Sequence, residues 1–288
     1  MREITLEELL EAGCHFGHQV TRSNPKARDF IFEARDNIHI IDLAKTKEGL
    51  EEAAAFIKDL ASKNQTLVVV GTKRQAKTIV EEEVKRAQAA TVGTTENLFY
   101  ITNRWVGGLL TNFPEVSKNF RKYHDLLTDL KDDEVRARYT KKEIGGWEKE
   151  SKKLENLYGG VANISKKPDA LFIIDSHMEN LAVRESLATH VPTVGLVDTN
   201  ADPFVIDYPI PANDDAVGSV KLTISYIMDA WIEGRKEAQK QQEISDMKQE
   251  ADKKKAAEKA AKVEDKKTAT TEAPKAKVKT VKAKAKKK

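Results

Sequence analysis

Short, continuously apolar runs that alternate with amphipathic stretches constrain the fold of this chain most. The runs "TLVVVGTKRQ" (66–75), "NLFYITN" (97–103), "DALFIID" (169–175) and "PTVGLVD" (192–198) have the length and composition of strands. Helical patterns lie beside them at 45–63, 75–90 and 179–190, and a long one begins near Asn213. Strands that are apolar throughout are typical of parallel sheets covered on both faces. The pattern predicts an α/β fold with a doubly wound, Rossmann-like or flavodoxin-like parallel sheet.

The segment that precedes these runs predicts a helix and a hairpin. Residues 4–12 have apolar side chains at helical spacing. The stretch "DFIFEARDNIHIIDL" (29–43) is typical of two short strands, because Asp36-Asn37 has the chemistry of a turn.

Residues 112–158 are very polar and break the alternation of strands and helices. Their sparse apolar positions predict two helices that pair through a narrow seam, as in an antiparallel coiled coil that protrudes into solvent. Each glycine of Gly145-Gly146 weakens a helix by about 1 kcal/mol relative to alanine. We therefore expect the second helix to break or to start late at that pair.

The distribution of charge sets the last part of the chain apart. Residues 241–288 contain 16 lysines and 8 acidic residues, whereas the first 240 contain 33 basic and 38 acidic residues. We expect an α/β domain at 1–111 and 159–240, a helical hairpin at 112–158 and a Lys/Ala-rich tail at 241–288. The tail is predicted to be largely disordered, above all after Thr268. A basic tail either contacts an anionic polymer or serves only solubility, and charge alone does not decide between these two.

Composition also bears on the compartment. No apolar run approaches the roughly 20 residues that span a bilayer, and the N-terminus has no signal-peptide pattern. A single cysteine fits a reducing compartment. The sequence predicts a cytoplasmic protein with no membrane partner.

A doubly wound fold invites the hypothesis of an enzyme, but its usual parts are incomplete. Gly71 stands between a strand and a helix without the further glycines of a phosphate-binding loop, so we interpret it as a turn. Cys14 has His15 beside it, although closeness in sequence does not establish a nucleophile and its base. A flavodoxin-like nucleotide- or metal-dependent enzyme stays open as the alternative function.

Carboxylates at the ends of two predicted strands raise the question of a metal. Asp175 and Asp198 end such strands, and Asp202 follows in "DTNADP". Capping of loops explains acidic residues at these positions equally simply. The second hypothesis is a Zn²⁺ or Mg²⁺ site in which His18 joins Asp198 and Asp202. We expect that no cofactor is required, whether or not Zn²⁺ or Mg²⁺ binds at this position.

Basic residues gather in islands on an otherwise acidic body. Arginine beside an aromatic residue, with Asn and Thr near it, suits contact with RNA backbone and unstacked bases. Ordinary solvated faces are the alternative, and charge alone favours RNA only modestly. The islands contain Arg22, Lys26 and Arg28, then Lys73 and Arg74, then Arg104 beside Trp105, and Lys118, Arg121 and Lys122 on the hairpin.

Several segments occur together in an order that goes beyond composition. They are "LLEAGCHFGHQVTRSNPK" (9–26), "VVVGTKRQA" (68–76), "NRWVGGLLTNF" (103–113), "VDTNADP" (197–203) and "DYPIPANDDAVGSVKL" (207–222). Over about residues 5–234 the chain resembles the bacterial small-subunit ribosomal protein two family. It departs from the family's pattern at Ser23, where an aromatic residue is common, and at Cys14, where a small aliphatic residue is usual.

The resemblance implies a non-catalytic ribosomal role. It implies binding to small-subunit rRNA between head and body, and help in docking the large messenger-binding ribosomal protein made of repeated OB-folds. It also implies a metal site at the interface with that protein, for which His18, Asp198 and Asp202 are the candidates. The positions that match RNA-facing motifs of the family are His15, His18, Gln19, Arg22, Asn24, Lys26, Lys73, Arg74, Asn103, Arg104 and Trp105, together with the hairpin cations. A third hypothesis is a protein-docking module whose contact with RNA is incidental.

Overall fold

The computed structural model describes residues 2–91 and 97–268, with side chains described as far as residue 242. The predicted disorder after Thr268 lies outside the described residues. A first compact unit extends to Gln239 and contains the sheet and the hairpin helices, and a second unit begins at Lys240. The finer division of the first unit into a body and a hairpin domain stays a prediction.

The first unit is built on a parallel five-stranded sheet in the order β5-β4-β6-β7-β8. The third strand of the chain to enter this sheet, β6, therefore lies on the opposite side of β4 from β5, which is the flavodoxin-like order. This confirms the predicted doubly wound sheet. The strands are β4 (Leu67–Val70), β5 (Leu98–Ile101), β6 (Ala170–Ile174), β7 (Thr193–Val197) and β8 (Tyr208–Pro211). Two prolines suit β8 to its edge position, where fewer ladder hydrogen bonds are needed.

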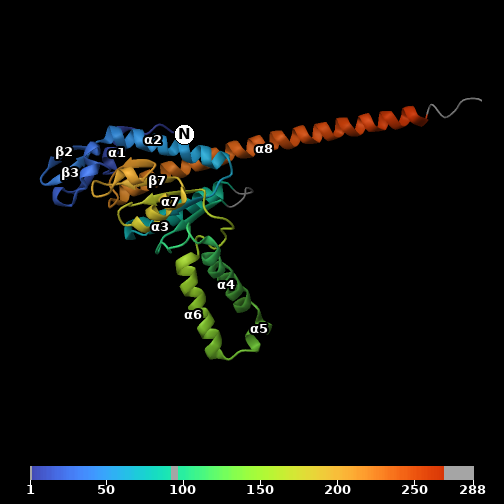
Figure 1. Ribbon diagram of the computed structural model, residues 1–288, viewed down its shortest axis with the longest axis horizontal. Helices are drawn as coiled ribbons and strands as arrows, with labels where there is room; N and C mark the ends of the chain where they lie inside the picture. The colour runs from blue at the N-terminus through green and yellow to red at the C-terminus, as the bar shows by residue number, and fades with distance from the viewer. Residues whose placement is uncertain (1, 92–96, 269–288) are drawn as a thin grey trace, which may run out of the picture. The chain divides into compact units, whose positions relative to one another are not determined.

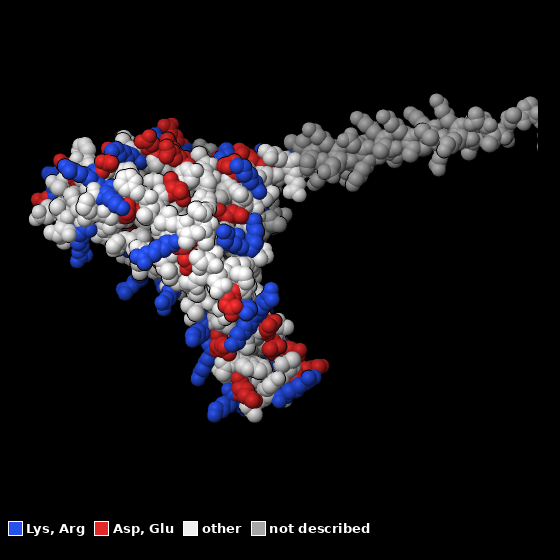
Figure 2. Space-filling view, viewed as in Figure 1, with Lys and Arg blue, Asp and Glu red and all other residues white. Residues whose placement is uncertain are grey.

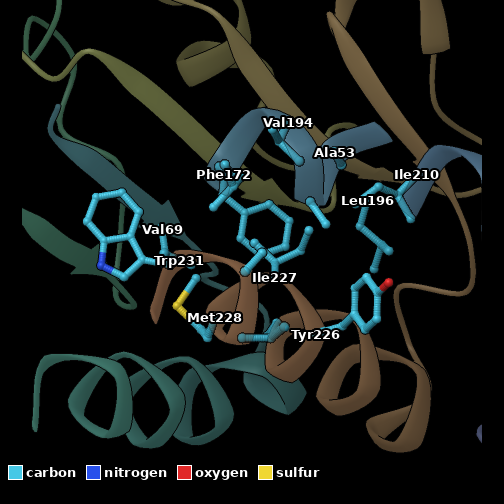
Figure 3. Close-up of a cluster of buried hydrophobic side chains, with 14 of the residues drawn as sticks. Ala53, Val69, Phe172, Val194, Leu196, Ile210, Tyr226, Ile227, Met228 and Trp231 are labelled. Carbon is cyan, nitrogen blue, oxygen red and sulfur yellow. The ribbon is translucent and has the colours of Figure 1, made fainter. Parts of the chain in front are cut away.

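Alternate residues of each strand point to opposite faces of this sheet. Because the residues on both faces are apolar, helices cover both faces. Val69 and Phe172 pack in one core with residues of α2 (Leu43–Ser62), α3 (Arg74–Ala90) and the start of α8 (Val217–Thr268). Figure 3 shows Trp231 and Ile227 of α8 beside Phe172 in this core. Val68 and Val70 face a second core that contains Val183 of α7 (Asn180–Thr189).

The N-terminal residues form a smaller sheet. It follows α1 (Leu6–Glu11) and has the order β1-β3-β2, with antiparallel strands β1 (Phe16–Gln19), β2 (Ile31–Arg35) and β3 (Ile38–Ile41). Short helical turns η1 (Val20–Arg22) and η2 (Pro25–Phe30) separate β1 from β2. Positive φ angles of 50° at Asp36 and 62° at Asn37 confirm the predicted turn between β2 and β3. Strand β1 was not predicted.

Two long helices leave the sheet and return to it (Figure 1). They are α4 (Phe113–Lys131) and α6 (Lys141–Tyr158), joined through the short α5 (Asp133–Ala137). The expected break at Gly145-Gly146 is wrong, because α6 runs through both glycines. Thr140 and Glu143 form a reciprocal capping box that fixes the start of α6 and offsets the weak helix propensity of the pair. Among the described residues, we find no helix with the length and apolarity needed to cross a membrane.

The two glycines of α6 offer a test of this account. A β-carbon added at Gly145 or at Gly146 meets nothing within 4 Å. The double change to alanine should therefore raise the free energy of unfolding, by about 1 kcal/mol per site. Thermal unfolding followed by circular dichroism measures the change. As a control, Gly71→Ala should destabilise, because its β-carbon would lie 2.8 Å from Val80. A destabilised double variant would show that the helix does not depend on local propensity here.

Candidate functional site

The carboxyl ends of β4 and β6 meet at a buried ion cluster around Lys73. The Nζ atom of Lys73 lies 3.0 Å from Asp175, 2.7 Å from Asp214 and 2.8 Å from Asp215. Burial lowers the pKa of Lys73, but the carboxylates outweigh it and leave the pKa above its ordinary value. The ammonium stays charged, and the neighbouring carboxylates neutralise that charge within the protein. Cations at the start of α3 oppose the helix dipole, and these carboxylates supply the compensation.

His18 of β1 connects the N-terminal sheet to the same cluster. Its Nδ1 atom lies 3.1 Å from Asp198 and its Nε2 atom 3.5 Å from Asp215. The hydrogen bond with Asp198 raises the pKa of His18, with burial opposing it. The backbone N–H of His18 also donates to the hydroxyl of Thr199 at 2.9 Å. A β-carbon at Gly17 would lie 2.7 Å from Thr199, so this close approach needs glycine.

Asp214 is a buried carboxylate with few hydrogen-bond partners. Its side chain is 1% exposed, and apart from the ion pair to Lys73 its oxygens have no hydrogen-bond partner among the described residues. Burial, then the charges of Asp175 and Asp198, raise the pKa of Asp214 to about 7. The pKa of Asp215 is lowered, chiefly by its hydrogen bond with Lys73. The network therefore holds two neighbouring carboxylates with opposite pKa shifts.

The candidate metal site in the structure contains Asp214 in place of the predicted Asp202. Ligand atoms of His18, Asp198 and Asp214 all lie within 4.8 Å of one another. Asp202 of the predicted set instead accepts from Lys26 Nζ at 2.5 Å. One imidazole and two buried carboxylates, one of them short of hydrogen bonds, fit a divalent cation such as Zn²⁺. The ammonium of Lys73 lies next to this position as a competing cation.

The residues considered for a catalytic site make structural contacts in the described part of the chain. Cys14 is fully buried, and burial raises the pKa of its thiol, which disfavours the reactive thiolate. Gly71 packs against Val80 and Ile174 and does not open a phosphate loop. The hydroxyl of Thr72 donates to the buried carboxylate of Glu179, and burial raises the pKa of that group. Carboxylates crowd the point between β4 and β6 at which flavodoxin-like folds bind phosphate ligands, and they disfavour an anion there.

The predicted RNA-facing residues fall into two groups in the structure. The lysines are engaged: besides Lys73 and Lys26, Lys118 pairs with Glu115 at 2.7 Å and Lys122 with Glu150 at 2.5 Å. The arginines are exposed and form no ion pair with any residue that the structure describes. This second group, here called the unpaired arginines, comprises Arg22, Arg28, Arg74, Arg104 and Arg121.

The remaining predicted residues have positioning roles or lie at the surface. Trp105 is 4% exposed and its Nε1 donates to Glu185 at 3.2 Å, so it anchors the loop from inside. Asn103 accepts from Lys77 and donates to the carbonyl of Asn156. His15 is partly buried, Gln19 is exposed, and the side chain of Asn24 accepts from the backbone N–H of Lys26.

Glu185 is a central residue that the sequence reasoning missed. Besides Trp105, its carboxylate accepts from the backbone N–H groups of Gly108, Leu110 and Thr111 at 2.8–3.3 Å. Burial raises the pKa of Glu185, but these hydrogen bonds outweigh it and the net pKa is lowered. Its position among the buried residues of α7 was the available signal, since an acid on an apolar helix face needs partners. Asp214 and Asp215 were also missed as site residues, because acidic residues at the start of the helix expected near Asn213 are explained by the helix dipole alone.

Together the fold and the site define a flavodoxin-like α/β protein whose ligand edge is closed by ion pairs and whose surface carries a helical hairpin and unpaired arginines. The family model described as ribosomal protein S2 matches residues 9–234, and the chain belongs to that family. This confirms the resemblance found in the sequence.

Relatives at 42–46% identity cover most of this chain. Small ribosomal subunit protein uS2 of Roseiflexus sp. is 46% identical over 237 residues, which are 81% of this chain and 86% of the relative. The protein of that name from Coprothermobacter proteolyticus is 44% identical over 235 residues, 82% and 84% of the two chains. That from Dictyoglomus thermophilum is 42% identical over 254 residues, 87% and 99%.

Removal of the central ammonium tests the ion cluster. Lys73→Met should lower the free energy of unfolding at neutral pH by about 3–5 kcal/mol, because the buried Asp175 and Asp214 lose their counter-charge. Urea unfolding measures the loss. Lys118→Met is the matched control at an exposed pair and should cost less than about 1 kcal/mol. Equal effects of the two changes would contradict the assigned role of Lys73.

The carboxylate under the Trp105 loop gives a prediction with a pH dependence. Glu185→Gln should destabilise the protein by about 2 kcal/mol at neutral pH. A lowered folded-state pKa means that the contribution of Glu185 is present above pH 4.5 and is lost as the pH falls further. The difference between wild type and variant should thus shrink below pH 4.5 in urea titrations. With the control Glu115→Gln, an exposed site, stability should change by about 0.5 kcal/mol or less. A pH-independent difference at Glu185 would refute the charged form as the anchor.

Proposed function

We propose that this protein is a structural, non-catalytic component of the small ribosomal subunit that binds small-subunit rRNA in the bacterial cytoplasm. Membership of the ribosomal protein S2 family supports the ribosomal role. The single observation that carries the RNA contact is the group of unpaired arginines. Their guanidinium groups lack carboxylate partners among the described residues, so they can neutralise phosphates without breaking existing ion pairs.

The position of each unpaired arginine follows from the packing beneath it. Arg104 precedes the loop that Trp105 and Glu185 anchor, and Arg22 belongs to the segment that His18 ties to the sheet. Figure 2 shows Lys and Arg along the lower edge of the body, Asp and Glu gathered at the top over α2, and charges of both signs on the hairpin. A rigid scaffold that aims separate cations at an RNA surface fits the proposed place between head and body. Preorganisation of this kind reduces the entropy lost on binding.

A second part of the proposal is docking of the messenger-binding protein with repeated OB-folds. The N-terminal sheet exposes Phe32 (71% of its surface), Phe16 (49%) and Ile38 (37%), and these apolar side chains are available to a protein partner. The candidate metal residues His18, Asp198 and Asp214 lie beside β1, and a divalent cation held by them would fix the orientation of this strand. Such an ion would be structural, and no cofactor is needed for the RNA contact.

Salt dependence of binding tests the role of the unpaired arginines. Filter binding of the full chain to small-subunit rRNA should weaken with NaCl, and Arg104→Gln and Arg22→Gln should each reduce the slope of log K against log salt by about 1. Arg86→Gln is the control, because Arg86 already pairs with Glu83 and Asp229. A wild-type chain that ignores the rRNA at low salt would disprove the proposed function. An unchanged slope in both arginine variants would remove these residues from the interface.

A further inference from the structure

A small cavity separates the exposed face of α7 from the N-terminal segment and the turn η3 (Pro203–Val205). Its volume is about 210 Å³. Pockets for free small molecules are usually larger, at about 300–1,000 Å³. The size therefore suits one unit of a polymer rather than an independent ligand. This cavity, called the α7 notch below, is lined by Asn24, Ser176, His177, Asn180, Val183, Arg184, Leu187, Asp202 and Val205.

Several polar groups of the α7 notch have unused hydrogen-bond donors or acceptors. Ser176 is 5% exposed, and its hydroxyl has no hydrogen-bond partner among the described residues. A buried hydroxyl in that condition costs free energy unless a ligand satisfies it. Asn24 accepts one backbone hydrogen bond with its amide oxygen, and Asn180 makes no side-chain hydrogen bond within the described part of the chain. Amides and hydroxyls are the groups that read the edges of an unstacked base.

The other walls suit a flat, partly apolar group. Val183, Leu187 and Val205 supply aliphatic surface, and Leu187 is 49% exposed. Arg184 is exposed and forms no ion pair with a described residue, so its planar guanidinium is available for stacking. Stacking on aromatic or guanidinium planes, combined with hydrogen bonds to base edges, is how proteins hold single unpaired nucleotides.

Charge distinguishes RNA from a protein as the occupant. Within 177–190 the exposed residues include Arg184, His177 and His190 but no acid. Asp202, the one carboxylate in the lining, is neutralised by Lys26 at 2.5 Å. The phosphates that flank an inserted base would therefore meet the guanidinium of Arg184 and no uncompensated carboxylate. We propose that the α7 notch receives one unstacked base of the RNA that this protein binds, an inference that rests on the proposed function.

A filling variant tests this proposal. Asn180→Trp changes an exposed residue to one large enough to occupy the notch, without altering any charge. Filter binding to small-subunit rRNA should become about tenfold weaker, as for loss of one stacked base. The slope against salt should stay unchanged, because a base contact releases no counterions. Ultraviolet crosslinking with mass spectrometry should place nucleotide adducts of the wild-type complex on residues 176–187.

The matched control fills a different cavity. Ser225→Trp places the same side chain, again without a change of charge, in a hollow lined by Glu8 and Glu11, where RNA is not expected, and should leave affinity within about twofold. Circular dichroism checks that both variants are folded. If wild type binds rRNA and Asn180→Trp binds equally well, the notch proposal fails while the proposed function stands. If that variant keeps rRNA affinity but loses retention on assembled subunits, the occupant is a protein and the proposal is overturned.

Discussion

The ammonium of Lys73 among three carboxylates is the interaction on which the rest of this structure depends. Asp175 follows β6, Asp214 and Asp215 precede α8, and Lys73 itself ends the turn after β4. His18 extends the cluster to Asp198 after β7. Buried charges are tolerated only when they are paired, so these segments, distant in sequence, must come together for any of them to be stable. The carboxyl ends of the strands, where a flavodoxin-like sheet usually binds its ligand, here hold segments of the protein together.

The basic residues of the predicted interface have two different roles. The lysines of the predicted interface satisfy carboxylates of the protein, whereas the unpaired arginines stay available at the surface. Arginine presents a planar fork that matches phosphate and can stack on bases, so it suits the second task better. The scaffold beneath them is fixed by two anchors. Glu185 holds the Trp105 loop, and Thr199 and Asp198 hold β1 through His18.

The parts of the fold that followed from sequence are those set by local patterning. Apolar strand runs gave the parallel sheet, and the Asp36-Asn37 turn gave the β2–β3 hairpin. Local reasoning failed at Gly145-Gly146, where the capping box at Thr140 outweighed helix propensity. Local reasoning also missed Glu185, Asp214 and the inward orientation of Trp105, because these depend on contacts between segments about 75 to 200 residues apart. Those contacts leave no periodic signal in the chain.

The most direct test is a cryo-electron microscopy map of small ribosomal subunits that contain this chain, at a resolution that shows side chains. The account predicts guanidinium groups of Arg22, Arg28, Arg74, Arg104 and Arg121 within hydrogen-bonding distance of rRNA phosphates. Lys73 should remain among Asp175, Asp214 and Asp215. A map in which Lys73 reaches a phosphate while these arginines face solvent would contradict the division of charge proposed here.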